Sequence, residues 1–406
     1  MIPQPRRSLD LWILGAVLGL VLIGVLANYS TSYAEGELEF THIHRQLLWS
    51  VIGFGLMLLA IGLPSKYYQS FAYIAFVLGI VALLAVLAIG TAKMGARRWI
   101  GVGFFEFQAS EVAKFTTLVG VARLLADSPR EMGRLWLTAL AVGMGVVPMG
   151  LVLVEPDLGT SLVFPAMLFC LLAWAGVPLW HLLLLLCPVA AVITSWDTTL
   201  HVITLVAILG LMYLSIRRLI PLASAAVLFL VIGSATTTLW NKLHPYQQKR
   251  LLTFLDPESD PLGSAYQIIQ SKIAVGSGGL TGKGFLHGTQ TQLKFLPAGH
   301  TDFIFSAWGE EMGFWGTVLV AALFFIVFYR GIRLASRCHN PFFSLVACGI
   351  VSMMAAQALT NLFMTVGLLP VTGVPLPFIS YGGSSLLVWM SLAGVLLGIS
   401  FRWREY

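Results

Sequence analysis

The stretch LWILGAVLGLVLIGVLA at residues 11–27 contains no charged side chain. A run of this length can cross the hydrocarbon core of a membrane as a helix. Similar runs recur along the chain, which is 58% hydrophobic and only 10% charged, whereas soluble domains carry about a quarter charged residues. Because a bilayer offers no water, the backbone of each run must satisfy its own hydrogen bonds, which helices do. The sequence therefore predicts an all-α polytopic membrane protein.

About twelve candidate transmembrane helices share this length and composition, and turn residues separate them. We expect a single integral membrane domain over residues 1–406. Arg6 and Arg7 precede the first run, which we interpret as a retained span because no small-x-small cleavage site follows it. The spans are predicted near residues 9–29, 47–63, 68–90, 110–126, 135–154, 159–176, 180–195, 199–216, 219–240, 312–334, 342–367 and 377–400.

The lysine and arginine residues predict how these spans are oriented. With the N-terminus inside, the short outside loops carry only four basic residues, Arg45, Lys93, Arg97 and Arg98. Positive charge marks cytoplasmic loops, so both termini are expected to be cytoplasmic. The same rule explains the net charge of +6 without a nucleic-acid partner. The polar segment 241–311 then forms one long extracytoplasmic loop, and long ordered loops are usually functional.

The cysteine and histidine residues indicate no metal site. The four cysteines are scattered, and no two have the spacing of a zinc or redox motif. Of the eight histidines, only His42 and His44 have a ligand-like spacing, and both lie in a loop. We therefore expect no metal bound by protein ligands alone.

Glu111 and Lys114 are an ionisable pair near the outer end of the fourth predicted span. A spacing of three places both side chains on one face of a helix. Charges within a span are costly and usually have a function. The pair is either a structural ion pair or part of a substrate site, and the spacing alone leaves both interpretations open.

The long loop contains a glycine cluster between residues 276 and 284, flanked by Lys272, Lys283 and Lys294. Glycine backbone N–H groups can approach an anion closely, so Lys272, Lys283 and these glycines are candidates to bind a pyrophosphate. The P-loop pattern is absent. The alternative is a tight turn with solvated lysines, which glycine clusters form most often.

Asp302 lies just before the apolar run that begins at Phe303, at the predicted outer boundary of the membrane. A low dielectric there raises the pKa of a carboxylate toward that of a general base. The alternative is that Thr301 or Asp302 caps the following helix. Asp157 is either a helix cap or a second acid in the site, and a Pro-Asp turn before a helix favours the cap.

The segment LPVTGVPLPFISYGGSSL at residues 369–386 contains three prolines and two adjacent glycines, which prevent a regular helix. Irregular backbone at membrane depth is tolerated only where it is buried in protein or lines a cavity. Ser380 and Ser384 are candidates to bind a substrate there. The alternative is that these hydroxyls satisfy the broken backbone.

Several segments together resemble the SEDS family (shape, elongation, division and sporulation) of bacterial membrane proteins. The segments DPESDPLG and GKGFLHGTQTQL resemble the elongation members more than the division members. The resembling segments are GARRW at 95–99, FQASEVAK at 107–114, EPDLGTS at 155–161, the stretch 255–305, and LPVTGVPLPFISYGGSS at 369–385.

The resemblance implies a peptidoglycan glycosyltransferase of the bacterial inner membrane. Its substrates would be lipid II and a polyprenyl-pyrophosphate-linked glycan, and its partner a class B penicillin-binding protein. The resemblance also implies that Asp302 is catalytic and that Glu111 and Lys114 belong to the functional core. No organic cofactor is implied, and a divalent cation (Mg²⁺ or Mn²⁺) would be bound with the substrate pyrophosphate rather than by a protein cage.

Two features depart from the family pattern. Ala109 stands where the family usually has proline, and residues 180–240 carry an apparent extra helical hairpin beyond the usual ten spans. Two other functions remain open. A lipid II flippase would need a site near the midplane, whereas the polar residues crowd the outer face; a non-catalytic scaffold for the penicillin-binding protein would not need Asp302.

Overall fold

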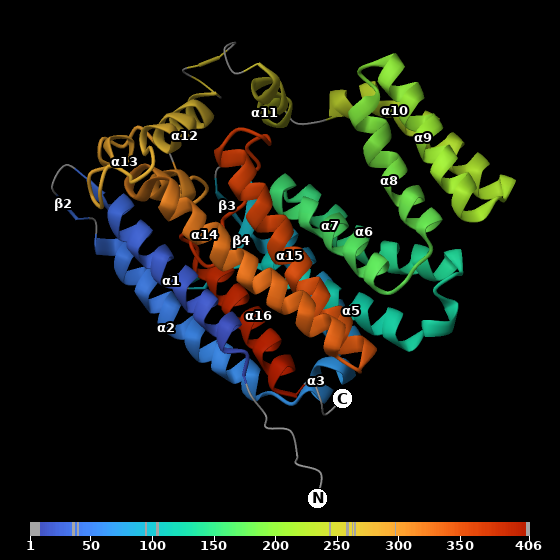
Figure 1. The fold of residues 1–406 in the computed structure, drawn as a ribbon, viewed down its shortest axis with the longest axis horizontal. Helices are drawn as coiled ribbons and strands as arrows, with labels where there is room; N and C mark the ends of the chain where they lie inside the picture. Colours follow the sequence, from blue (N-terminus) through green and yellow to red (C-terminus); the bar gives the residue numbers. More distant parts are fainter. Residues whose placement is uncertain are drawn as a thin grey trace, which may run out of the picture.

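The computed structural model describes residues 9–34, 37–38, 40–93, 96–102, 105–242, 245–256, 260–261, 263, 265–296 and 298–402. Twelve long helices within these ranges match the twelve predicted spans one to one, which confirms the all-α polytopic fold (Figure 1). They are α1 (Leu11–Ser32), α2 (Phe40–Gly62), α4 (Ala72–Ile89), α5 (Ala109–Asp127), α6 (Leu135–Val154), α7 (Leu158–Trp174), α8 (Leu179–Thr194), α9 (Thr198–Ile216), α10 (Leu219–Lys242), α14 (Ile304–Arg337), α15 (Pro341–Thr365) and α16 (Gly383–Arg402).

Nine helices in the described ranges are long and apolar enough to cross a membrane by length and composition. The other three long helices do not meet this criterion of length and composition. Helices α7 and α8 are apolar but shorter, and α5 carries Glu111, Lys114, Arg123 and Asp127. Helix α14 begins at Ile304, earlier than predicted, but its backbone breaks at Gly313 (φ 64°), beside the predicted start of the span.

The connections between the spans contain short elements. The sequence did not predict the antiparallel sheet between α4 and α5, whose register pairs Trp99 with Gln108. The elements are β1 (Tyr33–Ala34), β2 (Glu37–Leu38), α3 (Ser65–Ser70), β3 (Thr91–Lys93), β4 (Ala96–Val102), β5 (Phe105–Gln108), the 3-10 helix Pro129–Glu131, α11 (Pro245–Leu255), α12 (Tyr266–Ser277) and α13 (Thr289–Gln292).

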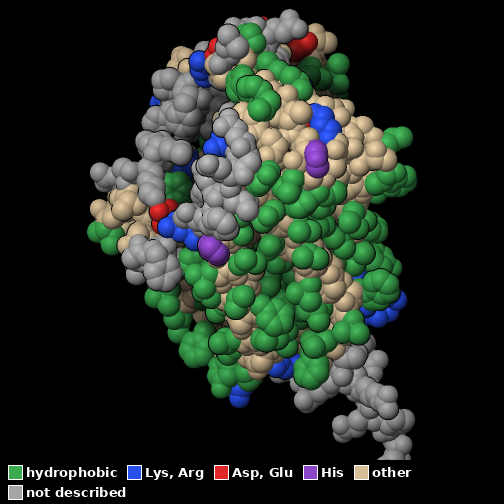
Figure 2. All heavy atoms as spheres, turned by 90° about the vertical axis from the view of Figure 1, so that its left-hand side faces the viewer, with side chains coloured by type: hydrophobic (Ala, Val, Ile, Leu, Met, Phe, Trp, Pro, Cys, Tyr) green, Lys and Arg blue, Asp and Glu red, His purple; other side chains and the backbone are tan. Residues whose placement is uncertain are grey.

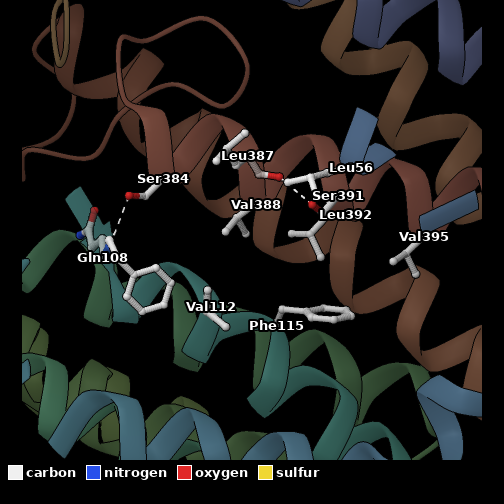
Figure 3. Close-up of a pocket in the computed structure, with 11 residues that line it drawn as sticks. Leu56, Gln108, Val112, Phe115, Ser384, Leu387, Val388, Ser391, Leu392 and Val395 are labelled. Carbon is white, nitrogen blue, oxygen red and sulfur yellow. Dashed lines mark hydrogen bonds between the residues drawn. The ribbon is translucent and has the colours of Figure 1, made fainter. Parts of the chain in front are cut away.

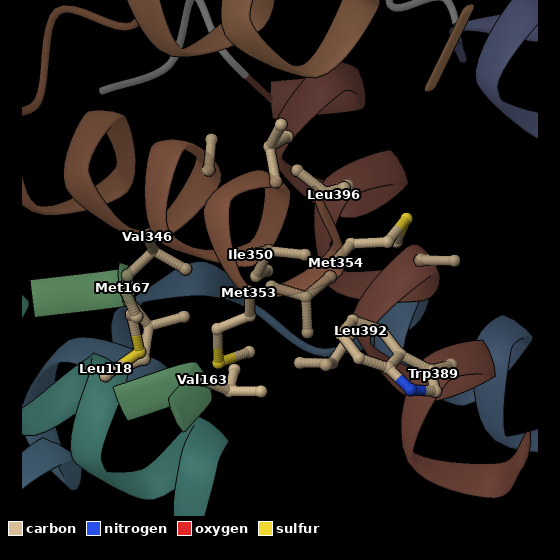
Figure 4. Close-up of a cluster of buried hydrophobic side chains, with 14 of the residues drawn as sticks. Leu118, Val163, Met167, Val346, Ile350, Met353, Met354, Trp389, Leu392 and Leu396 are labelled. Carbon is tan, nitrogen blue, oxygen red and sulfur yellow. The ribbon is translucent and has the colours of Figure 1, made fainter. Parts of the chain in front are cut away.

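The core lies where α5, α7, α15 and α16 meet, and Figure 4 shows its packed methionine, leucine and tryptophan side chains. Helices α15 and α16 are 72% and 78% buried over their most apolar windows, whereas α9 is only 11% buried. The outer helices therefore expose apolar side chains, as a lipid environment requires. Figure 2 shows these side chains over the middle of one face, with most charged side chains toward its two ends.

Polar contacts join both ends of the described chain at one end of the bundle, here called the terminal end. The Asp10 backbone N–H donates to Ser400 Oγ (3.2 Å), and Arg330 Nε donates to Asp10 Oδ2 (2.8 Å). Arg402 donates to the backbone carbonyls of Ile61, Gly62 and Leu63 at the end of α2. The opposite end, here called the loop end, carries α11, α12 and α13 (Figure 1).

Helices α8, α9 and α10 fill the region where the extra hairpin is predicted, and they lie to one side of the bundle in Figure 1. Most of their buried apolar residues form a separate cluster drawn from these three helices alone, while Leu182 of α8 belongs to the main core. Within it, His201 Nδ1 lies 2.9 Å from Thr194 Oγ1, and its ring packs on Phe229. The unit joins the main body through α8, where His181 bonds Thr138 Oγ1 (2.9 Å).

A change at Gly24 of α1 is expected to destabilise the fold, while the same change at Gly15 is not. A Cβ at Gly24 would lie 2.7 Å from Phe378 O and 2.8 Å from Ile379 Cα, whereas a Cβ at Gly15 meets nothing within 4 Å. Backbone cannot yield as a side chain does, so Gly24→Ala should lower the melting temperature of the purified protein. Gly15→Ala should leave it equal or slightly higher, because alanine favours helix. Equal melting temperatures for both variants would contradict this packing.

Candidate functional site at the loop end

The segment between α15 and α16 has no regular secondary structure, and its residues 374 and 376–380 are buried. Side-chain amides of α15 satisfy its carbonyls: Gln357 Nε2 donates to Pro375 O (2.9 Å), and Asn361 Nδ2 donates to Val374 O (2.7 Å). Phe378 adopts a positive φ of 65° although it is only 1% exposed. A bulky residue in this conformation is strained and marks a backbone that its surroundings fix.

Asp302 lies at the junction between this segment and the long loop. Three hydrogen bonds fix the backbone around it: Asn361 Nδ2 to Asp302 O (2.9 Å), Ser380 Oγ to Thr301 O (2.6 Å) and the Tyr381 N–H to His300 O (2.9 Å). The Asp302 side chain is half-buried. Its position is therefore set by α15 and by the segment between α15 and α16, not by the long loop alone.

The capping interpretation of Thr301 and Asp302 is wrong. The N-cap of α14 is Phe303, and no side chain caps that helix. Thr301 Oγ1 instead bonds the carbonyl of Ala298. By contrast, Asp157 caps α7 by accepting from the Thr160 N–H (3.1 Å), which confirms that prediction. Of the two aspartates, only Asp302 therefore lacks a capping role.

Glu111 and Lys114 form an ion pair of 2.9 Å in the first turn of α5, and both side chains are 2% exposed. Lys114 Nζ also donates to Gln357 Oε1 (2.7 Å) and lies 5.4 Å from the centre of the Trp389 ring. Glu111 Oε2 has no hydrogen-bond partner. The pair thus connects α5 to α15 and α16, next to the segment that positions Asp302.

Gln357 and Asn361 lie one turn apart on α15 and are 1% and 0% exposed. Gln357 joins Lys114 to Pro375, and Asn361 joins Asp302 to Val374. These two amides therefore fix the buried ion pair and the aspartate relative to one another. Sequence reasoning missed both, because uncharged amides in an apolar helix carry no distinctive pattern.

The glycine-rich loop packs against the start of α14. The N–H groups of Lys283 and Gly284 donate to the carbonyls of Glu310 and Glu311 (3.0 Å each), and the Phe314 N–H donates to Gly279 O (2.9 Å). These bonds bridge the helix break at Gly313. They account for this loop as a structural turn, which was the alternative to a phosphate site.

Lys283 is paired with Glu310, a residue that sequence reasoning did not single out. Glu310 is 0% exposed, and its Oε1 accepts from Lys283 Nζ (2.7 Å), Thr289 Oγ1 (3.1 Å) and the Gln290 N–H (3.0 Å). Its Oε2 accepts two bonds from Thr291. The positive charge of Lys283 is thus largely neutralised by Glu310. Binding of a substrate by Lys283 stays a prediction.

The other candidate ligands differ in how far their polar groups are engaged. Ser380 Oγ accepts from the Leu376 N–H and donates to Thr301 O, and Ser384 Oγ bonds backbone groups of β5. Both hydroxyls therefore satisfy backbone, as the alternative interpretation expected. Lys272 is exposed on α12, with its aliphatic part near Gly367. Substrate binding by these three residues remains untested.

A second acidic group lies in the turn between α6 and α7. Glu155 is 1% exposed and Asp157 3% exposed. Burial is the main cause that raises the pKa of Glu155 to about 8; the neighbouring Asp157 adds to this rise, and Arg98 opposes it. Arg98 itself donates to the backbone carbonyls of Glu155 and Pro156.

Comparison with known proteins identifies the family. A family model described as "cell cycle protein", which covers FtsW, RodA and SpoVE, matches residues 8–196 and 181–405. The chain belongs to the SEDS family. The two matched segments of this SEDS protein overlap within α8, in the region of the predicted extra hairpin.

Curated relatives match the SEDS chain over nearly its whole length. The peptidoglycan glycosyltransferase MrdB of Escherichia coli K12 is 35% identical over 397 residues, covering 97% of this chain and 94% of the relative. The peptidoglycan glycosyltransferase RodA of Treponema pallidum is 34% identical, covering 97% and 98%. The stage V sporulation protein E of Bacillus subtilis is 32% identical, covering 99% of each chain.

Solved structures share the fold. A chain of a peptidoglycan synthase complex that coordinates polymerization and crosslinking has a TM-score of 0.72 and 29% identity, covering 98% of this chain and 99% of that one. The crystal structure of the rod shape determining protein RodA from Thermus thermophilus has a TM-score of 0.66 and 24% identity, with the same coverage. The second similarity supports the fold alone.

The effects of replacing Glu111 and Lys114 on stability should depend on one another, because the two residues form a buried ion pair. Removing one partner of a buried ion pair leaves an uncompensated charge and costs about 3–5 kcal/mol. We expect Glu111→Gln and Lys114→Met each to lower the melting temperature strongly, and the double variant to regain much of the loss. A double variant that melts below both single variants would contradict a mutual pair. Arg123→Met, which breaks an exposed pair with Asp127, is the matched control and should change little.

Proposed function

We propose that this SEDS protein is a peptidoglycan glycosyltransferase that polymerises lipid II at the loop end of its bundle. The names of its curated relatives support the reaction class. The observation that carries the site assignment is Asp302, a half-buried residue that α15 and the segment before α16 position through the three hydrogen bonds around it. Such support from rigid elements is what a general base requires.

In the proposed reaction, Asp302 accepts the proton of the acceptor sugar hydroxyl on lipid II. The hydroxyl oxygen attacks the anomeric carbon of the growing glycan, and the bond to the pyrophosphate lipid breaks. This single displacement inverts the anomeric centre. Glu111 and Lys114 do not take part in the proton transfer, because the pair is neutral as a unit and fully buried; it holds α5 against α15.

A groove between α2, α5 and α16 suits a substrate with a long hydrocarbon chain. Its volume is about 310 Å³, and its walls are almost entirely apolar (Figure 3). Its polar groups include Gln108 and Ser384, which lie together at the β5 end, while Phe115 and Val395 line the part farther along the helices. A polar head at one end and an apolar tail along the helices match this arrangement. The groove thus supports a lipid-linked substrate.

The pyrophosphate lipid is the leaving group, and its negative charge must be stabilised. Lys272 is an exposed cation of the loop end, whereas Lys283 is committed to Glu310. The described residues contain no cluster of three or more His, Cys, Asp or Glu that could bind a metal. A divalent cation would therefore need phosphate oxygens among its ligands, in the manner usual for Mg²⁺.

The proposal includes an orientation and a partner. The loop end faces the outside of the bacterial cytoplasmic membrane, where lipid II sugars are exposed, and both termini are cytoplasmic, in agreement with the distribution of basic residues. The proposed partner is a class B penicillin-binding protein that crosslinks the new strands. The similarity to a chain of a synthase complex supports such a pairing.

Replacing Asp302 should abolish polymerisation. Asp302→Asn keeps the shape of the side chain but cannot accept the proton, so purified protein should form no glycan polymer from lipid II, alone or with the partner synthase. The melting temperature should change little, because the three bonds that position this part of the chain reach backbone carbonyl groups, which the substitution leaves in place. The matched control is Asp127→Asn, an exposed aspartate at the end of α5, which should polymerise normally.

Two other outcomes would identify the alternative functions. If Asp302→Asn still polymerised lipid II, the assignment of the base would be wrong. If neither protein polymerised but wild-type protein moved labelled lipid II across vesicles, a flippase would be supported. If Asp302→Asn restored growth of cells that lack this protein, a scaffold role would be supported instead.

Replacing Lys272 should change substrate binding, whereas replacing Lys283 should change stability. Lys283→Met leaves the buried Glu310 carboxylate without its ion-pair partner, so we expect a clear loss of melting temperature. Lys272→Met removes an exposed cation from the loop end and should leave stability unchanged but raise KM for lipid II severalfold. Steady-state polymerisation assays and thermal unfolding separate the two. An unchanged KM in Lys272→Met would exclude Lys272 from substrate binding.

A further inference from the structure

Glu155 is a buried carboxylate whose oxygens lack partners. It follows the last residue of α6, is 1% exposed, and neither Oε1 nor Oε2 has a hydrogen-bond partner. The neighbouring cation, Arg98, directs its hydrogen bonds to backbone carbonyls of the turn. A buried polar group without a partner is costly. The carboxylate of Glu155 therefore needs a partner that the described protein groups do not provide.

Asp157 provides a second carboxylate in the same turn. It is 3% exposed, and its rotamer is fixed by Thr160 and by Gln108 Nε2 (3.3 Å to Oδ2). These bonds use only some of the acceptor sites of a carboxylate, which offers about four. Two acidic side chains, one of them with both oxygens unbonded, thus share one turn.

This turn lies against the segment that positions Asp302. A Cβ at Gly159 would lie 2.7 Å from Thr372 O, so the start of α7 touches the segment 372–376. Asn361 binds Val374 in that segment and also binds Asp302. The acidic turn is therefore a neighbour of the segment between α15 and α16, which Asn361 links to Asp302.

We propose that Glu155 and Asp157 bind a divalent cation, Mg²⁺ or Mn²⁺, whose other ligands are water and the pyrophosphate oxygens of the lipid substrate. Mg²⁺ commonly binds one or two carboxylates together with substrate phosphates and waters. The absence of a third acidic, histidine or cysteine ligand in the described part of the chain leaves coordination positions for phosphate. The cation would neutralise charge on the leaving pyrophosphate.

Only the pyrophosphate ligands rest on the proposed function; cation binding by the two carboxylates does not. The competing explanation is that Glu155 simply stays protonated in a dry site and binds nothing. This explanation predicts that replacing the acid by its amide has no effect on cation binding. The two explanations therefore differ in a measurement that needs no substrate and no catalytic turnover.

The experiment measures Mn²⁺ binding to the purified full chain in nanodiscs by the loss of the free-ion EPR signal, with Mg²⁺ as competitor. The variants are Glu155→Gln and Glu155→Asp, with Glu131→Gln, an acidic residue of the connection between α5 and α6, as the matched control. We expect one Mg²⁺-displaceable Mn²⁺ in the wild type and in Glu131→Gln. In Glu155→Gln its affinity should fall at least tenfold, and Glu155→Asp should retain part of it. Mn²⁺ should also raise the melting temperature of the wild type but not of Glu155→Gln.

Asp302→Asn separates this proposal from the proposed function. It should bind Mn²⁺ as the wild type does while forming no polymer. If it polymerised, the base assignment would fail but the cation site would stand. If Mn²⁺ bound equally to the wild type and Glu155→Gln, or to neither at millimolar concentration, the cation site would be refuted, whatever the activity of Asp302→Asn.

Discussion

The structure depends on one constraint: irregular backbone inside a membrane bundle must find its hydrogen bonds within the protein. The segment between α15 and α16 meets this constraint through Gln357, Asn361 and Ser380, and through Asn28 of α1, which donates to Ile379 O (2.9 Å). Water would satisfy these carbonyls on a soluble surface, but a bilayer offers none. Helices α1 and α15 therefore converge on a few residues of this backbone.

This convergence also explains why the proposed base lies where it does. The same amides that satisfy the segment reach the carbonyl of Asp302 and the side chain of Lys114. The position of the proposed base thus follows from the need to satisfy buried backbone. A site built in this way is rigid, because any movement of Asp302 would break bonds that have no replacement in an apolar environment.

The sequence predicts the helices well because each is a long apolar run, and the bilayer leaves no other regular structure for such runs. It fails where polar residues join a helix. Glu310 and Glu311 made residues 304–311 resemble a loop. These residues are helical and buried, because Lys283 pairs with Glu310 and Ser30 of α1 donates to Glu311. Lys283 lies 27 residues from Glu310 in sequence, so no local pattern reveals this ion pair. The catalytic role of Asp302, which the family resemblance implies, stays a prediction, whereas Gln357, Asn361 and Glu155 stand out only through the folded contacts.

The separate apolar cluster of α8, α9 and α10 limits how cooperatively the chain can unfold. Cooperative melting requires that parts of a protein lose their contacts together, and this cluster shares no buried side chain with the main core among the described residues. Sub-global opening of the three helices would therefore leave the bonds around Asp302 in place.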